Sequence, residues 1–193
     1  MDKGEMKAGA ARVAINLEDV LPFDGFDALR HEIFARAFVV EGMGRRACIL
    51  SLEVTSIAPA LLVDLREVVK DVSNCDGALS WVVPTHTFSA PHVRTPGHLA
   101  DTDARDRNER YRAALIAATR AAVEQAVAGI RSVTLASAEG YCPVNVNRDI
   151  ETPAGWWLGV DPKGFADHAM PILVARDAEG GLVAMLATAD VQS

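Results

Sequence analysis

The chain has 193 residues, of which 50% are hydrophobic and 23% are charged, values that are ordinary for one globular, core-forming domain. Its formal net charge of −7 and its pI near 5.2 argue against nucleic acid or an anionic membrane as a partner, because both select basic surfaces. No stretch approaches the roughly 20 apolar residues that cross a bilayer, and the polar first residues lack a signal-peptide core. The three cysteines are widely spaced, without a Cys-x-x-Cys pair. We therefore expect a cytoplasmic protein with reduced thiols.

The first half of the sequence predicts strands and one helix. Residues 11–15 form a short apolar run that is typical of an edge strand. Residues 32–42 and 45–54 are rich in β-branched and large apolar side chains and flank a Gly-Met-Gly turn, which predicts a hairpin. Residues 59–72 place leucine and valine at helical spacing after a proline that a first turn tolerates. Residues 78–85 are nearly all apolar and predict a central strand covered on both faces.

The second half alternates long loops with regular elements. Residues 92–110 are polar and predict a long loop of the kind that often carries a binding site. A helix is predicted over 111–130, followed by a strand over 132–141. Residues 145–170 predict a second long irregular segment, and residues 171–189 predict a closing hairpin. Strands that alternate with two helices, joined by both hairpins and crossovers, predict an α/β fold in which helices flank a mixed β-sheet.

The most distinctive stretch is Pro-Thr-His-Thr-Phe-Ser-Ala-Pro-His at residues 84–92. His86 follows an apolar strand and precedes a loop, which is where open α/β sheets present ligand-binding side chains. An imidazole there suits metal binding or proton transfer; the alternative is a histidine that only bonds a neighbouring threonine. Glu53 ends another predicted strand, and if the two strands are parallel neighbours it emerges beside His86 as an orienting group or general base. The alternative is a strand-end glutamate that faces water.

Other candidates lie in the two predicted loops. His92 and His98 follow His86 at intervals of six residues, which matches no standard structural zinc spacing. Exposed loop histidines are the alternative. Asn147 and Arg148 open the second loop, where a guanidinium can clamp a carboxylate or orient a carbonyl and an amide can donate to an oxyanion. The alternative there is a turn held by Asn and Asp side chains.

Several of these stretches, in this order, resemble the N-terminal part of the neutral/alkaline, non-lysosomal ceramidase family. Residues 84–92 resemble its Thr-His-Thr-His-Ser-Gly-Pro signature, and the other matching stretches are residues 7–15, 33–41, 45–54, 145–149 and 161–186. The resemblance implies that residues 1–193 are the first portion of a ceramidase-like α/β hydrolytic domain, incomplete without a C-terminal segment or companion chain. It also implies an amide hydrolase in which zinc polarises the carbonyl or activates water.

The resemblance also implies roles for single residues. His86 corresponds to a zinc-ligating histidine of the signature, whereas Phe88 occupies the position of the signature's second histidine. Asp190 stands where the family has another zinc histidine, and a carboxylate oxygen is an accepted zinc ligand. The family's catalytic serine and remaining ligands lie beyond the matching part. For substrate binding we predict Arg148, Asn147, Phe88 and His92.

Three functions remain open from the sequence. The first is cleavage of the C–N bond of an amide smaller than ceramide, assisted by zinc on His86 and Asp190, with His86 and Glu53 as catalytic residues. The second is the first chain of a self-cleaving hydrolase, whose nucleophile is the N-terminal residue of a companion chain. The third is a non-catalytic binding domain on the same fold. A homo-oligomer is compatible with each.

Overall fold

The computed structural model describes residues 5–99 and 101–191, and these form three sheets and two long α-helices. The strands of the first sheet, in spatial order, are β4 (Ser80–Pro84), β3 (Arg45–Leu52), β2 (Phe34–Gly42), β1 (Lys7–Ala14) and β5 (Arg131–Ser132). The second sheet consists of β10 (Leu182–Ala187), β9 (Ala169–Arg176) and β6 (Thr134–Tyr141), and the third is a hairpin of β7 (Asn147–Thr152) and β8 (Gly155–Asp161). The helices are α1 (Pro59–Ser73) and α2 (Thr102–Ala128), and two short 3₁₀ turns cover Gly77–Leu79 and Pro96–His98.

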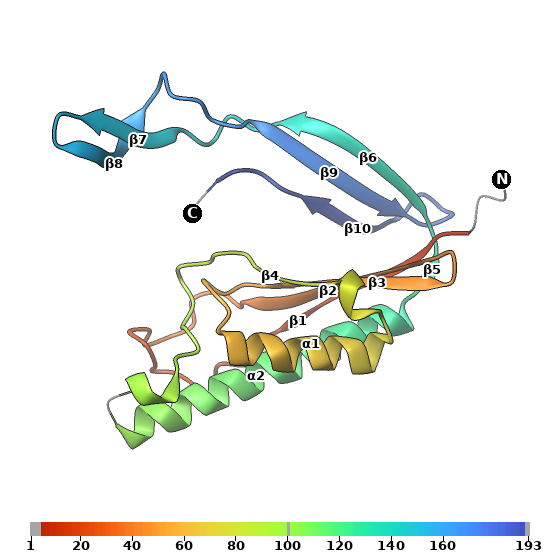
Figure 1. Cartoon of the computed structure of the whole chain (residues 1–193). Coiled ribbons are helices and arrows are strands. Elements are labelled where there is room, and N and C mark those ends of the chain that lie inside the picture. Colours follow the sequence, from red (N-terminus) through yellow and green to blue (C-terminus); the bar gives the residue numbers. More distant parts are fainter. Residues whose placement is uncertain (1–4, 100, 192–193) are drawn as a thin grey trace.

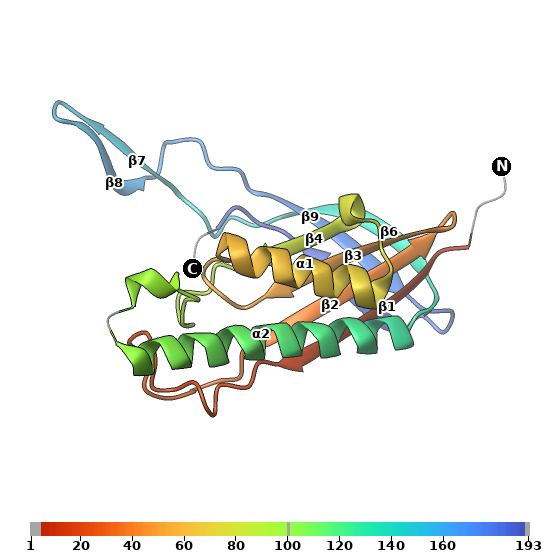
Figure 2. The ribbon, with the colours of Figure 1, turned by 60° about the horizontal axis from the view of Figure 1, so that its bottom comes forward.

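The elements are arranged in three layers (Figures 1 and 2). Both helices cover one face of the first sheet, with α2 packed on β1 and β2 and α1 on β3 and β4. The second sheet lies over the opposite face, while the β7–β8 hairpin projects away from the body of the molecule. The first sheet is mixed, because β3 and β4 are parallel and the other pairs are antiparallel. The predicted fold class, a mixed sheet flanked by helices, is confirmed.

The alternation of side chains in β2 separates the two faces of the first sheet. Ala35, Ala37 and Val39 are buried in the main core together with side chains of both helices. Arg36 and Phe38 lie between them in sequence and line a hollow of about 470 Å³ against β10. Because successive strand residues point to opposite faces, β2 contributes alternate side chains to the core and to the space between the two sheets.

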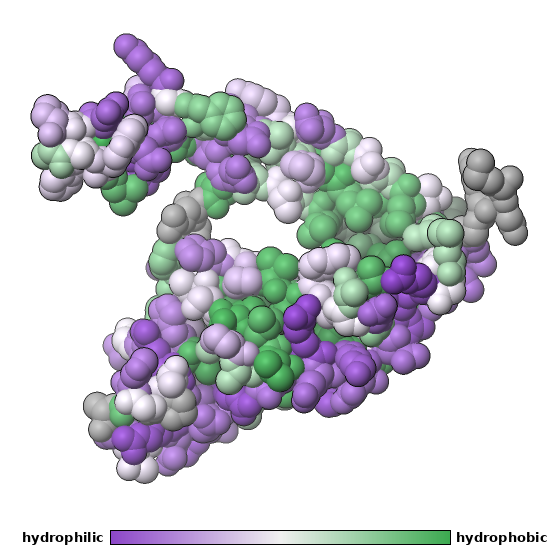
Figure 3. All heavy atoms as spheres, in the orientation of Figure 1, coloured by the Kyte–Doolittle hydropathy of each residue, from purple (hydrophilic) through white to green (hydrophobic). Residues whose placement is uncertain are grey.

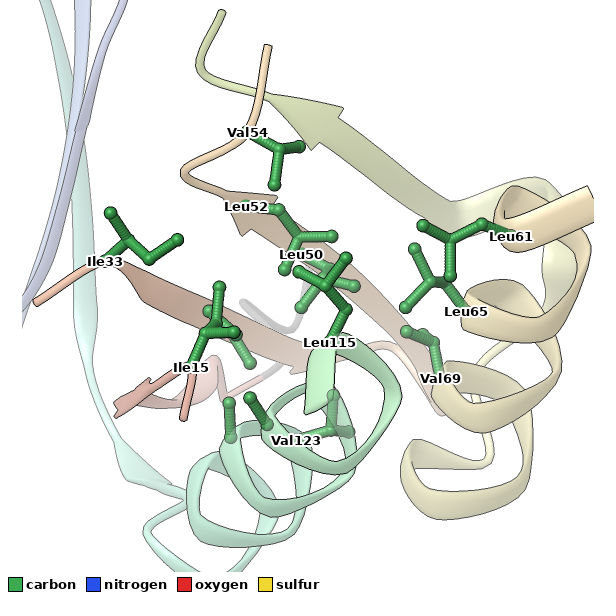
Figure 4. Close-up of a cluster of buried hydrophobic side chains, with 14 of the residues drawn as sticks. Ile15, Ile33, Leu50, Leu52, Val54, Leu61, Leu65, Val69, Leu115 and Val123 are labelled. Carbon is green, nitrogen blue, oxygen red and sulfur yellow. The ribbon is translucent and has the colours of Figure 1, made fainter. Parts of the chain in front are cut away.

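The helices turn apolar stripes toward the core face (Figure 4). Leu61, Leu65 and Val69 recur at intervals of four on α1, and all three are almost completely buried. From α2, Leu115 points toward Leu50 of β3 and toward α1. The predicted helix at 59–72, the hairpin at 32–54 and the closing hairpin at 171–189 are therefore all confirmed.

Some of the predicted elements are wrong in place or extent. The strand at 78–85 was expected to be central, but β4 is an edge strand whose Trp81 and Val83 are 49% and 44% exposed. An apolar run does not distinguish a strand covered on both faces from an edge strand with one apolar face exposed. The strand predicted at 11–15 is longer, spans Lys7–Ala14, and has the two-residue β5 beside it.

The loop regions also contain more regular structure than predicted. Residues 145–170 were expected to be irregular, but they hold the β7–β8 hairpin, which turns at Gly155 with a φ of 109°. Its strands mix polar and aromatic residues without clean alternation, so periodicity does not reveal them. The helix predicted from residue 111 begins at Thr102, where Asp101 caps it by accepting a hydrogen bond from the Ala104 N–H at 2.8 Å.

Candidate functional site

The parallel pair β3–β4 brings Glu53 and His86 to the same edge of the first sheet. Leu52 lies opposite Pro84 in the register of this pair, so the residues that follow the two strands leave the sheet together. This confirms the predicted neighbourhood of the two strand ends. Binding side chains gather at such carboxyl edges because the parallel strands end there side by side.

Backbone hydrogen bonds continue past the strand ends and hold the backbone on both sides of His86. The Thr85 N–H donates to Leu52 O at 2.9 Å, and the Thr87 N–H donates to Val54 O at 3.2 Å. Between these anchors His86 has a φ of 60°, in the left-handed region that few non-glycine residues occupy. Unusual backbone conformations of this kind cluster at functional sites, where the surrounding structure over-determines them.

The His86 ring has an aromatic neighbour on its own loop. The rings of His86 and Phe88 meet edge to face, with centroids 4.9 Å apart and an interplanar angle of 76°. His86 is exposed and Phe88 is half-exposed. Thr55 supports this loop from β3's side, because its hydroxyl donates to Thr87 O at 2.7 Å. Phe88 therefore limits the orientations of the imidazole while leaving it accessible.

Glu53 is held by the neighbouring strand. Its carboxylate accepts hydrogen bonds from the Phe34 N–H at 2.7 Å and from Arg36 Nη1 at 2.6 Å, and the side chain is 24% exposed. The guanidinium groups of Arg36 and Arg12 both lie over the Phe34 ring, about 5 Å from its centroid. These contacts position Glu53, and its role as a catalytic residue stays a prediction.

A second polar cluster joins two loops that are distant in sequence. Asp24 accepts four hydrogen bonds: Oδ2 binds the His92 N–H at 2.8 Å and His92 Nδ1 at 2.7 Å, and Oδ1 binds Arg94 Nη2 at 2.9 Å and Nε at 3.2 Å. Burial acts to raise the pKa of Asp24, but these hydrogen bonds outweigh it and hold the pKa below its ordinary value. The sequence does not predict the contacts of Asp24 with His92 and Arg94, because its Phe-Asp-Gly context indicates only a turn.

Asn108 of α2 ties the same loop to the helix. Its Oδ1 accepts from the Arg94 N–H at 2.7 Å, and its Nδ2 donates to Arg94 O at 3.1 Å. Asn108 is only 1% exposed. Side-chain hydrogen bonds thus hold the loop after β4 at both ends, at its start from Thr55 and at its end from Asp24 and Asn108.

Asn147, Arg148 and Asp190 line a different region, an open hollow of about 800 Å³ at the base of the β7–β8 hairpin. Asn147 donates to Phe165 O at 2.8 Å, and Arg148 Nε donates to Gly159 O. Both side chains therefore support the hairpin backbone. Their predicted roles in substrate binding, like those of Phe88 and His92, stay predictions.

The donor set for a metal is incomplete in the described part of the chain. Among residues 5–99 and 101–191, no three His, Cys, Asp or Glu side chains come together as ligands. Protein zinc sites use three or four protein ligands, and zinc binding by His86 and Asp190 stays a prediction. Burial, with a smaller contribution from Cys75, raises the pKa of the Cys48 thiol to about 12, which disfavours a thiolate ligand or nucleophile there.

Comparisons with known proteins find similarity in structure but not in sequence. No family model matches the sequence, and no curated protein matches it. Among solved structures, the neutral ceramidase from Pseudomonas aeruginosa superimposes with a TM-score of 0.73 and 20% identity, over 100% of this chain and 32% of that chain. The chain has the fold of part of a neutral ceramidase. A ceramidase complexed with C2 matches with a TM-score of 0.70 and 19% identity, over 98% and 32%.

The similarity to ceramidase confirms the resemblance read from the sequence at the level of the fold. The chain spans about a third of the length of both ceramidase structures. At identities of 20% and 19% the similarity carries no residue roles. Neither described helix is both long enough and apolar enough to span a membrane.

Proposed function

We propose that this chain is one part of a ceramidase-like hydrolase that cleaves the C–N bond of a small amide. The observation that carries the proposal is the combination of a ceramidase-like fold over the whole chain with His86 at the carboxyl edge of β3 and β4. An exposed imidazole in a fixed, unusual backbone conformation suits a group that must meet a substrate in one orientation.

In this proposal His86 contacts the amide itself and donates a hydrogen bond to its carbonyl oxygen. Negative charge develops on that oxygen when the carbonyl is attacked, and a donor that is already in place stabilises it. Phe88 restricts the His86 ring, and Glu53 fixes the adjacent strand end. Arg148 and Asn147, in the hollow below the hairpin, are proposed to bind the more distant part of the substrate.

Replacing His86 with alanine tests this assignment, because alanine has no side-chain donor. We expect the H86A variant of the product of the complete gene to lose roughly 100-fold in kcat towards short N-acyl amides, the usual effect of removing one such donor. His98, which is also exposed but lies in a short 3₁₀ turn, provides the matched control H98A, with unchanged activity expected. Release of the amine is measured for both. Equal activity of H86A and wild type would contradict the role of His86.

Zinc is proposed only for an assembly in which another segment adds ligands to His86 and Asp190. For the present chain alone we expect well below one zinc per molecule after dialysis, because the described residues supply no group of three ligands. Elemental analysis by mass spectrometry, with H86Q as the comparison, checks this. One zinc per chain that disappears in H86Q would contradict it and would indicate a complete site.

We propose that a further segment or a companion chain completes the unit. Trp81 and Val83 on β4 and Met185 and Leu186 on β10 are exposed, and Figure 3 shows hydrophobic side chains gathered where the two sheets approach each other. Exposed apolar clusters of this kind usually mark an interface. Native mass spectrometry of the product of the complete gene tests the idea. A second chain supports self-cleavage, one longer chain supports an uncleaved hydrolase, and a lone inactive chain supports a binding domain.

A further inference from the structure

The cluster around Asp24 determines which nitrogen of His92 carries a proton. With its pKa held below the ordinary range, Asp24 is ionised near neutral pH, and a carboxylate can only accept hydrogen bonds. The 2.7 Å contact between Oδ2 and His92 Nδ1 therefore requires the proton on Nδ1. Arg94 Nη2, 3.4 Å from the same nitrogen, then acts as a neighbouring charge, because Nδ1 has no lone pair for it.

The other ring nitrogen of His92 is left available. None of the hydrogen bonds found among the described residues engages Nε2 of His92, and its side chain remains 30% exposed. In the neutral imidazole a proton on Nδ1 leaves a lone pair on Nε2. The side chain thus offers a proton acceptor on the nitrogen away from Asp24.

The two carboxylate oxygens of Asp24 bind different residues. Arg94 binds Oδ1 alone, and both contacts from His92 go to Oδ2. Only 13% of the Asp24 side chain is exposed, and its backbone has a φ of 54°. Because Asn108 also fixes the Arg94 backbone, the carboxylate has little freedom to release the imidazole.

We propose that His92 is a catalytic proton carrier of this chain and that Asp24 is its positioning residue. The inference rests on the proposed amide hydrolysis and adds the group that moves the proton. As a water oxygen bonds to the amide carbon, one water proton passes to His92 Nε2. When the C–N bond breaks, that proton passes to the leaving nitrogen, so the products are an acid and an amine and His92 returns to its neutral form.

The first test needs no substrate. In ¹⁵N NMR spectra of the wild-type chain recorded at alkaline pH, where imidazoles are neutral, we expect the Nδ1-protonated tautomer of His92. The D24G variant tolerates the positive φ and removes both acceptor oxygens, so we expect the preference for Nδ1 to be lost. D103N, which removes the exposed Asp103–Arg107 pair, is the control and should leave His92 unchanged. An Nε2-protonated wild type, or an unaltered tautomer in D24G, would overturn the inference.

The second test separates proton transfer from folding. With short N-acyl amides and the product of the complete gene, we expect H92Q to lose roughly 100-fold in kcat and D24G roughly 10-fold, with KM nearly unchanged, as for a general base. We also expect added imidazole to restore part of the activity of H92A. Full activity of H92Q beside an active wild type would overturn the role of His92 and leave the proposed hydrolysis intact. An inactive wild-type product of the complete gene, with the Nδ1 tautomer present, would overturn both and leave the pair a structural contact.

Discussion

Replacing Gly9 with alanine is expected to destabilise the protein by about 3 kcal/mol, at the upper end of the usual cost of overpacking. Gly9 lies in β1 where the end of α2 crosses it. A Cβ on Gly9 would lie 2.0 Å from Ala126 O and 2.9 Å from Ile130 N. Both are backbone atoms that cannot swing aside as a flexible side chain can, so α2 must move off the sheet. The free energy of unfolding from urea denaturation measures the effect.

Gly77 provides the matched control for this prediction. Nothing lies within 4 Å of a Cβ added there. The G77A variant should therefore change the free energy of unfolding by about 0.5 kcal/mol or less, as is usual for surface positions. A G9A variant no less stable than G77A would mean that α2 does not approach β1 this closely.

Replacing Asn108 with alanine is expected to cost about 3 kcal/mol, because it leaves two partly buried backbone groups without a partner. The affected groups are the N–H and the carbonyl oxygen of Arg94, which Asn108 binds at 2.7 and 3.1 Å. Since Arg94 also binds Asp24, the loop after β4 should lose its fixed conformation. Urea denaturation gives the stability, and amide hydrogen exchange gives the protection of the Arg94 N–H, which should fall.

The N108D variant tests the mechanism behind this loss. Its carboxylate can still accept from the Arg94 N–H but can no longer donate to Arg94 O. We therefore expect protection of the Arg94 N–H to persist in N108D, while stability still falls because a buried carboxylate oxygen then faces the Arg94 carbonyl oxygen. Unchanged exchange at Arg94 in N108A would show that another group holds the loop.

Local sequence patterns were sufficient to predict much of the fold. The hairpin at 32–54 has β-branched residues on both sides of a glycine turn, and α1 has apolar residues at helical spacing, so each could be recognised from its own residues. The β7–β8 hairpin escaped recognition because aromatic, acidic and glycine residues interrupt its alternation. Its exposed Trp156 and Trp157 indicate no buried face from which a pattern could arise.

The candidate site, like the fold, could be predicted from the sequence only in part. The sequence by itself determined that Glu53 and His86 end apolar strands, and the parallel pairing of β3 with β4 then brings those ends together. It also determined which residue types line the loop after β4. Only the tertiary structure decided that β4 is an edge strand and that Asp24 binds His92 from 68 residues away. The physical reason is that a turn aspartate and a loop histidine carry no local periodicity, so their pairing depends on how the chain packs around α2.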